Sequence, residues 1–413
     1  MQQKRLDWES FIDVSLYVFT IALLFLYEGK NSFLYVLACI LLGVIFVART
    51  IQRRKLLFDK KVIWLIAFTL LATASYFWAT DRKNVLDVLP ILLANEFIAY
   101  AFMNFIHDRP ARLELLMRAI IIGSILLGLR AAIEFGPTAF FSKRMLNTLG
   151  ANDLGLYAAI GANFCLYFWL KYREKKQIPL AILCILVVVM SFSRKALIFL
   201  ALPAALILIF YKRNNIKKIL LRIGIIIGII ALAIGSIFVI PPLRNTFGQG
   251  IEAVVNGVFD TGKKTDASVH ARMKFIEYGT DMFLERPIQG FGLNNFKNLI
   301  AVRKTKGMTN VYAHNNYIEI AVDLGIIGLV VYYSLYVYMI VYGLKRFKKL
   351  NLNQLAMLSI LVTLAICEYG VVSYYGDFYH ILIAFTWMSL IYVSDNLDLV
   401  PPTHKTRKKL SNV

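Results

Sequence analysis

Charged residues are scarce in this sequence, and acidic ones are scarcest. Only 17% of the 413 residues are charged, whereas 59% are hydrophobic, and 25 Asp and Glu residues stand against 46 Lys and Arg residues. A soluble domain usually carries about 25% charged residues. The composition therefore excludes a soluble globular protein and predicts an all-α polytopic membrane protein.

Cysteine and glycine-rich motifs are also scarce. The four cysteines all fall inside apolar runs and none forms a Cys-x-x-Cys pair, so neither a disulfide framework nor a zinc site is indicated. Gly290 and Gly292 lack the third glycine and the strand–helix setting of a dinucleotide-binding loop. We therefore predict no cofactor and no metal, and we expect the cysteines to be small core residues.

Twelve long apolar runs are present instead. Most are near the ~20 residues that a helix needs to cross the hydrocarbon core. The predicted spans are 11–27, 32–48, 62–79, 85–106, 113–133, 153–170, 178–193, 196–211, 219–240, 315–342, 355–372 and 378–393.

The basic residues indicate which side of the membrane each loop occupies. Twenty-eight of the 46 fall in the two termini and in every second loop, ten fall in the long segment 241–314, and the other loops share eight. The positive-inside rule then places both termini in the cytoplasm. The net charge of +21 is therefore mainly a topology signal, and no RNA-binding motif points to nucleic acid.

This topology predicts three parts. Residues 1–240 form an N-terminal bundle of nine helices, 241–314 form an extracytoplasmic catalytic loop, and 315–413 contain three helices and a cytoplasmic basic tail. The first span contains Asp13 and lacks a small-residue cleavage site, so we expect a retained signal anchor. An enzyme on the outer face needs a substrate that was activated before it crossed the membrane.

Two candidate arginines lie on the outer side. Ser193 and Arg194 separate two apolar runs with almost no loop between them; an isolated arginine in such a place commonly contacts lipid phosphates. Arg272 precedes apolar residues that recur at helical spacing over 275–283, which predicts an amphipathic helix. The alternative for Arg272 is a solvated charge on that helix.

A third motif begins the tenth span. His314 and Asn315 stand at its N-terminus, where the helix dipole disfavours an imidazolium and keeps a neutral base available. The alternative is a capping or interfacial histidine. Gly325 and Gly328 follow, and by themselves they indicate only close helix packing.

In their order along the chain, these motifs resemble those of the O-antigen ligase and O-antigen polymerase superfamily of bacterial membrane glycosyltransferases. The resemblance spans most of the chain. Its residues are Arg144, Ser193, Arg194, Arg272, Pro287 to Gly292, Asn295, Phe296, His314, Asn315, Gly325 and Gly328. Asp153 and Asp323 depart from the residues that the family more often has at these places.

The resemblance implies a GT-C-like, metal-independent, inverting glycosyltransferase in the bacterial inner (plasma) membrane. Its donor is an oligosaccharide on undecaprenyl diphosphate, and its acceptor is a sugar hydroxyl of a glycan or glycolipid. Arg194 and Arg272 would bind the diphosphate. His314 would be the general base, with His270 in reserve. Supporting or substrate-positioning roles fall to Ser193, Arg144, Arg286, Gly290, Gly292 and Asn315.

Three functions remain open. We favour polymerisation of surface polysaccharide repeat units, because no docking site for a lipid A core is recognisable; a ligase that transfers glycan to lipid A core has the same motifs. A flippase or transporter for lipid-linked oligosaccharide also has about twelve spans. Its case rests on polar residues within the spans, namely Asn95, Glu96, Asn163, Glu319, Asp323 and Glu368. Sugar identity, linkage, chain length and oligomeric state are not encoded in any recognisable motif.

The topology predicts how a thiol reagent reaches the long loop. Lys264→Cys, in a background without the four native cysteines, is expected to react with a membrane-impermeant maleimide in intact cells, because 241–314 is extracytoplasmic. A cysteine at Lys408 in the C-terminal tail should react only after permeabilisation. The reverse pattern would contradict the topology.

Overall fold

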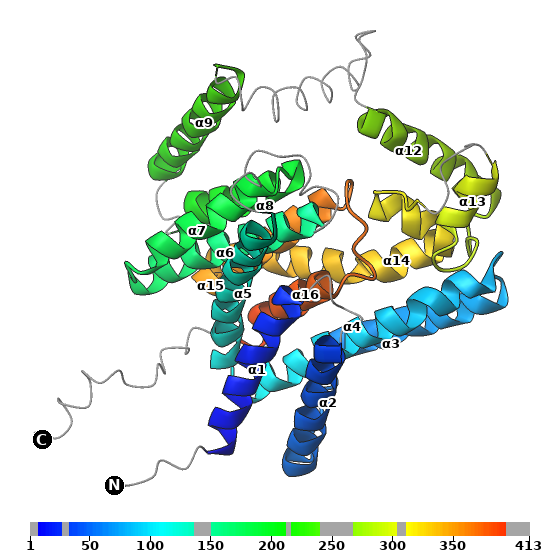
Figure 1. The fold of residues 1–413 in the computed structure, drawn as a ribbon, viewed down its shortest axis with the longest axis horizontal. Coiled ribbons are helices and arrows are strands. Elements are labelled where there is room, and N and C mark those ends of the chain that lie inside the picture. Colours follow the sequence, from blue (N-terminus) through cyan, green and yellow to red (C-terminus); the bar gives the residue numbers. More distant parts are fainter. Residues whose placement is uncertain are drawn as a thin grey trace, which may run out of the picture.

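The computed structural model describes residues 7–26, 33–135, 150–211, 216–239, 267–303 and 311–393 (Figure 1). These ranges are helical and contain no β-strand. The α-helices are α1 (Trp8–Phe25), α2 (Phe33–Arg53), α3 (Lys60–Ala74), α4 (Arg82–Asp108), α5 (Ala111–Phe135), α6 (Ala151–Tyr172), α7 (Gln177–Met190), α8 (Arg194–Phe210), α9 (Ile216–Val239), α12 (Ala267–Glu285), α13 (Phe296–Arg303), α14 (Asn316–Lys345), α15 (Leu352–Cys367) and α16 (Asp377–Ile391). Two short 3-10 helices are η2 (Ser75–Phe77) and η6 (Phe347–Lys349).

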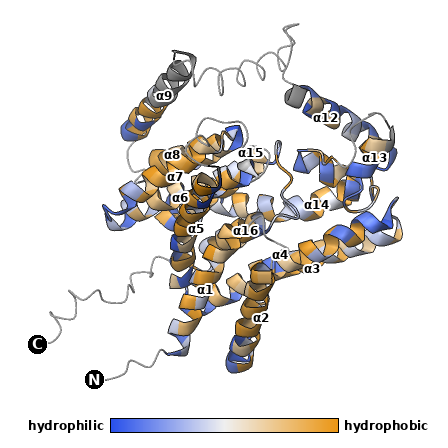
Figure 2. Cartoon of the chain, viewed as in Figure 1, coloured by the Kyte–Doolittle hydropathy of each residue, from blue (hydrophilic) through white to orange (hydrophobic). Residues whose placement is uncertain are grey.

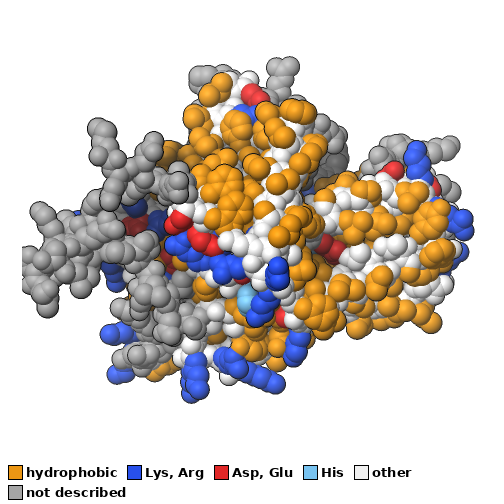
Figure 3. All heavy atoms as spheres, turned by 90° about the horizontal axis from the view of Figure 1, so that it is seen from below, with side chains coloured by type: hydrophobic (Ala, Val, Ile, Leu, Met, Phe, Trp, Pro, Cys, Tyr) orange, Lys and Arg blue, Asp and Glu red, His pale blue; other side chains and the backbone are white. Residues whose placement is uncertain are grey.

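Each of the twelve predicted spans overlaps a helix, which confirms the all-helical class. Among the described residues, seven helices are long and apolar enough to cross a membrane: α1 to α6, with α3 extended through η2, and α14. Hydrophobic residues make up most of these helices (Figure 2). On one face of the molecule, hydrophobic side chains cover broad areas and Lys and Arg side chains gather between them (Figure 3). Twelve complete crossings remain a prediction.

Buried ion pairs join the helix ends on the predicted cytoplasmic side. Arg49 of α2 binds Asp108 of α4 through two contacts of 2.5 and 2.6 Å. Arg112 of α5 binds Asp13 at 2.7 Å and Glu9 at 2.6 Å, both on α1. Because a buried charge is tolerated only when paired, these basic residues also fix how the helices pack.

The amphipathic helix predicted around Arg272 is confirmed as α12. Phe275 and Met282 are buried, and Tyr278 and Phe283 pack against the same hydrophobic cluster. This cluster also contains residues of α13 and α14, and it is separate from the larger core, to which α14 contributes other residues. α12 therefore presents its apolar face to α14.

α14 is broken at Gly325, whose φ of 64° and ψ of −162° are not helical. The ring of Tyr317 stacks on that of Tyr333 at 4.6 Å, and Asn316 Nδ2 donates to the Tyr333 hydroxyl at 3.0 Å. Sixteen residues of straight helix rise about 24 Å, too far for these contacts. Residues 316–324 therefore fold back beside 326–345.

The prediction of one continuous span over 315–342 is wrong in this respect. Hydropathy does not reveal the break, because both segments are apolar and the reversal depends on the backbone conformation of Gly325. The second segment alone, residues 326–345, measures about 30 Å at 1.5 Å per residue and matches the hydrocarbon thickness.

The segment after α12 supplies partners for the backbone groups freed by this break. Phe291 N–H donates to Val322 C=O at 2.9 Å and Gly292 N–H to Asp323 C=O at 2.8 Å. On the other side of the break, Ile326 N–H donates to Pro287 C=O at 2.8 Å. Buried backbone groups need such partners, so residues 287–296 and the broken helix depend on each other.

The Asp323 side chain completes this junction. Its carboxylate accepts backbone N–H groups from Asn294 at 2.6 Å, Asn295 at 3.0 Å and Phe296 at 2.9 Å. The hydroxyl of Tyr374 donates to it at 3.3 Å. A buried carboxylate with this many donors holds the start of α13 against α14.

Gly325→Ala should destabilise the protein. A Cβ there would lie 2.2 Å from the carbonyl oxygen of Ile288, and the positive φ disfavours any L side chain. We expect the free energy of unfolding to fall by about 3 kcal/mol or more, measured as a lower Tm of the detergent-solubilised protein. Gly43→Ala is the matched control, because a Cβ there meets nothing within 4 Å. Equal Tm values for the two variants would contradict the role of Gly325.

Candidate functional site

His314 lies in a tight turn that is held from both sides. Its φ of 54° is in the left-handed region, which a non-glycine residue adopts only when neighbours enforce it. Asn315 caps α14 by accepting hydrogen bonds from the N–H groups of Tyr317 at 3.0 Å and Ile318 at 3.2 Å. The Glu319 carboxylate accepts the N–H of the residue before His314 at 2.5 Å. The turn is therefore pre-organised by the first turn of α14.

Aromatic rings surround the His314 imidazole. The ring of Tyr312 lies 4.0 Å away between centroids, and Phe275 of α12 stacks nearly parallel at 6.3 Å. His314 Nδ1 is buried and has no hydrogen-bond partner among the described residues. The geometry thus fixes the ring but leaves one of its nitrogens without a partner in the described part of the chain.

Two cations act on this imidazole. Burial, and then the positive charges of Arg272 and Lys195, lower the pKa of His314 from its usual 6.5 to about 4. Each of these causes disfavours the protonated ring. His314 is therefore neutral at physiological pH, as the sequence predicted, and the causes are burial and the neighbouring cations.

The turn between α7 and α8 brings one of these cations into the site. Ser193 caps α8 by accepting the N–H of Ala196 at 3.3 Å, and its hydroxyl donates to Asn152 Oδ1 at 2.9 Å. Lys195 lies against the segment between α15 and α16, because a Cβ on Gly370 would be 3.4 Å from its Cε. The turn between α7 and α8, the start of α6 and the segment between α15 and α16 thus meet near Lys195.

The predicted residues divide into two groups. Arg272 of α12 lies within electrostatic range of His314 in the turn before α14. Arg194 is exposed in the first turn of α8, next to Lys195. Ser193 and Asn315 cap helices on either side of the site. His270 is exposed on α12.

The remaining predicted residues contribute to packing around the broken helix or lie outside the described residues. Arg286 places its guanidinium over the ring of Phe291 at 4.7 Å. Gly290 and Gly292 have φ of 68° and 97°, and a Cβ on Gly290 would be 2.6 Å from the Asp323 carbonyl. Both glycines therefore support the broken helix. Arg144 lies outside the described residues.

Sequence reasoning gave no role to Lys195, Asp153 or Tyr312. Lys195 interacts electrostatically with Arg272 and Asp153, and Tyr312 packs on His314. In the sequence, only their positions near other candidate residues could have pointed to them. Lys195 follows Arg194, Asp153 begins a span, and Tyr312 precedes His314 by two residues. Only the fold shows that these positions converge.

No cluster of three or more His, Cys, Asp or Glu side chains suited to a metal ion occurs in the described ranges. Whether the reaction proceeds without a metal therefore stays a prediction. Of the four cysteines, Cys165, Cys184 and Cys367 are buried and Cys39 is partly buried, and all four are free thiols, as expected of small core residues.

A family model described as O-antigen ligase matches residues 179–333. The match runs from α7 to the second segment of α14 and includes Ser193, Arg194, Arg272 and His314. It supports the superfamily that the ordered motifs resemble. No curated protein matches the chain.

The site predicts an unusual titration of His314. In a background lacking the other four histidines, ethoxycarbonylation by diethyl pyrocarbonate requires the neutral ring, so its rate should rise with pH through the folded pKa of about 4. Lys195→Met removes a positive charge and should shift this midpoint upward. Lys195→Arg keeps the charge and is the control. A wild-type midpoint near 6.5, or one unmoved in Lys195→Met, would contradict the electrostatic coupling.

Proposed function

We propose that this chain joins a polyprenyl-diphosphate-linked oligosaccharide to an acceptor sugar hydroxyl, because the family model described as O-antigen ligase matches residues 179–333 and the ordered motifs resemble the same superfamily. Proteins of this family are glycosyltransferase-like, membrane-embedded and act on lipid-linked glycans. The product that we favour is a longer surface polysaccharide, made by joining repeat units on the outer face of the inner membrane.

One observation carries the proposal: a neutral histidine lies beside cations. His314 can accept a proton, and Arg272 and Lys195 provide positive charge within electrostatic range of it. Transfer from a diphosphate needs both, since the acceptor loses a proton while the leaving group gains negative charge. Arg194, at the same end of α8 as Lys195, adds a forked donor for phosphate oxygens.

The proposed reaction is a direct displacement. The acceptor oxygen attacks the anomeric carbon, the bond from that carbon to the diphosphate oxygen breaks, and the acceptor proton passes to His314. The carrier diphosphate leaves with the bonding electron pair, held by the cations. Attack from the side opposite the leaving group inverts the anomeric centre.

Donor binding should also activate the base. The charges of Arg272 and Lys195 lower the pKa of His314 in the free protein. A bound diphosphate offsets both charges, so the pKa rises toward the range in which a general base is most effective. The empty enzyme would thus hold a weak base that becomes stronger when the donor is present.

Helix lengths favour a site within the outer leaflet, close to the headgroups. α7 has 14 residues and α15 has 16, about 21 and 24 Å of helix against the ~30 Å hydrocarbon layer. If both begin at the cytoplasmic boundary, they end within the outer leaflet. Arg194 and the segment after α15 lie at those ends, where the diphosphate of a membrane carrier would also lie.

The polar residues within the spans give the transporter alternative less support once their hydrogen bonds are known. Asn95 Nδ2 donates to the Tyr375 carbonyl at 2.7 Å, and Asn163 Nδ2 to the Phe199 carbonyl at 2.9 Å. The Glu368 carboxylate accepts the Tyr336 hydroxyl at 2.7 Å. These side chains hold neighbouring backbone and helices, so a transport pathway is not needed to explain them.

The assay that tests this function uses purified protein, synthetic polyprenyl-diphosphate glycan and a glycan acceptor. Wild-type protein should form longer or transferred glycan and release carrier diphosphate. His314→Ala should lower kcat by roughly 100-fold to 10,000-fold without preventing donor binding, because a general base is lost. His270→Ala is the matched control, since His270 is exposed on α12, and it should retain activity.

Two results would count against the proposal. Wild-type protein that moves the lipid-linked glycan across a vesicle membrane without forming a glycosidic bond would favour a transporter. Full activity of His314→Ala together with a loss in His270→Ala would move the base to His270. Comparing a carrier-linked repeat unit with a lipid A core as acceptor separates polymerase from ligase.

A further inference from the structure

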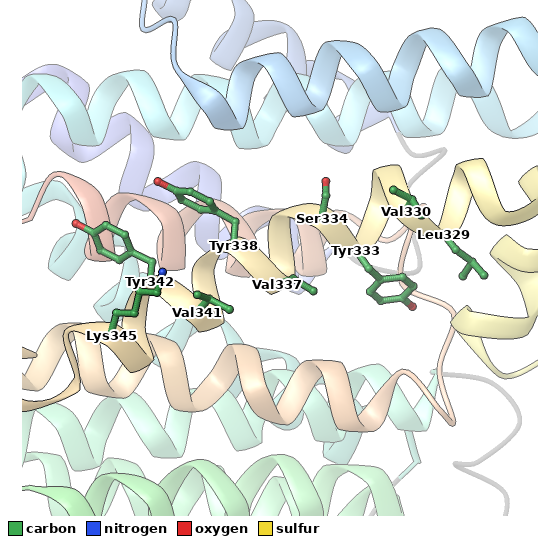
Figure 4. A pocket seen from close by; sticks show the side chains of 9 residues that line it. All are labelled: Leu329, Val330, Tyr333, Ser334, Val337, Tyr338, Val341, Tyr342 and Lys345. Carbon is green, nitrogen blue, oxygen red and sulfur yellow. The ribbon is translucent and has the colours of Figure 1, made fainter.

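A long groove follows the described surface of α14 from Leu329 to Lys345 (Figure 4). Its volume is about 760 Å³, and all of its lining side chains come from this one helix. Val330 and Val337 are 62% and 58% exposed, so its floor is apolar and open. The surface can therefore receive hydrocarbon along most of the second segment of α14.

One end of the groove is connected to the candidate site. Tyr333, a lining residue, accepts a hydrogen bond from Asn316 at 3.0 Å and stacks on Tyr317 at 4.6 Å. Asn316 and Tyr317 follow His314 by two and three residues. The reversal at Gly325 is what brings this turn beside the groove, because a straight helix would separate His314 from Tyr333 by about 28 Å.

The other end is marked by charge and by a neighbouring helix. Lys60 of α3 lies over the ring of Tyr338 at 4.9 Å, and Arg346 over the ring of Tyr342 at 4.1 Å. Lys345 closes the lining at this end. The groove thus runs from the turn that holds His314 to a basic end in the predicted cytoplasmic loop.

The groove is longer than one leaflet is thick. The seventeen residues from Leu329 to Lys345 cover about 24 Å, whereas one leaflet is only about 15 Å of the ~30 Å hydrocarbon core. A phospholipid acyl chain anchored at the outer surface would fill only part of the groove. A polyprenyl chain whose diphosphate lies near His314 can extend along all of it.

We propose that this groove holds the polyprenyl chain of the donor carrier. The inference rests on the proposed function for the identity of the head group, and it assigns the lipid specificity of the donor to α14. The chain adds affinity by apolar contact, while the cations near His314 hold the diphosphate.

Chain-length dependence tests the groove. Val337→Trp fills its middle and should raise KM for a full-length polyprenyl donor about tenfold, the effect of removing roughly two methylene groups from an apolar environment, with kcat unchanged. KM for a donor with only two isoprene units should not change. Ile40→Trp on α2 is the matched control, since Ile40 and Val337 are 57% and 58% exposed. An unchanged KM for the full-length donor, or an equal rise for both donors, would overturn the proposal.

A second measurement does not depend on catalysis. A photoreactive residue at position 337 or 40 is placed in nanodiscs with polyprenyl diphosphate and excess phospholipid. Crosslinks at 337 should be enriched in polyprenyl diphosphate over those at 40. Equal ratios at the two positions would overturn the proposal that the groove binds the polyprenyl chain, even if transfer occurs. Enrichment at 337 without glycosidic bond formation would support polyprenyl binding in the groove and refute the proposed reaction.

Discussion

The structure depends on satisfying the backbone of a helix that breaks inside an apolar region. Where α14 reverses at Gly325, its freed carbonyl and amide groups pair with residues 287–296. Hydrocarbon offers no alternative partners, so an unpaired break would be costly. The glycines at 290, 292 and 325 follow from this constraint, because each sits where a Cβ would collide with neighbouring atoms.

The same reversal builds the candidate site. It places the turn with His314 beside α12 on one side and Tyr333 on the other. Arg272 of α12 and Lys195 of α8 lie within electrostatic range of the imidazole. The proposed base and the proposed lipid groove therefore depend on one helix that changes direction, and a defect at Gly325 should affect both.

Electrostatics gives the site a built-in order of events. Cations that favour an anionic donor also suppress protonation of the base while the donor is absent. In the proposed reaction, a bound diphosphate would offset these charges and strengthen the base. Such coupling would link proton acceptance to occupancy of the donor site without a conformational change.

The sequence by itself determined the membrane class, the positions of the described apolar helices apart from the break in α14, the amphipathic α12, and the candidacy of His314 and Arg272. These follow from local composition and periodicity, which act within one segment. The reversal at Gly325, the structural role of Gly290 and the arrival of Lys195 beside His314 were decided only by the tertiary structure. Each depends on contacts between residues tens of positions apart, and neither hydropathy nor spacing contains that information.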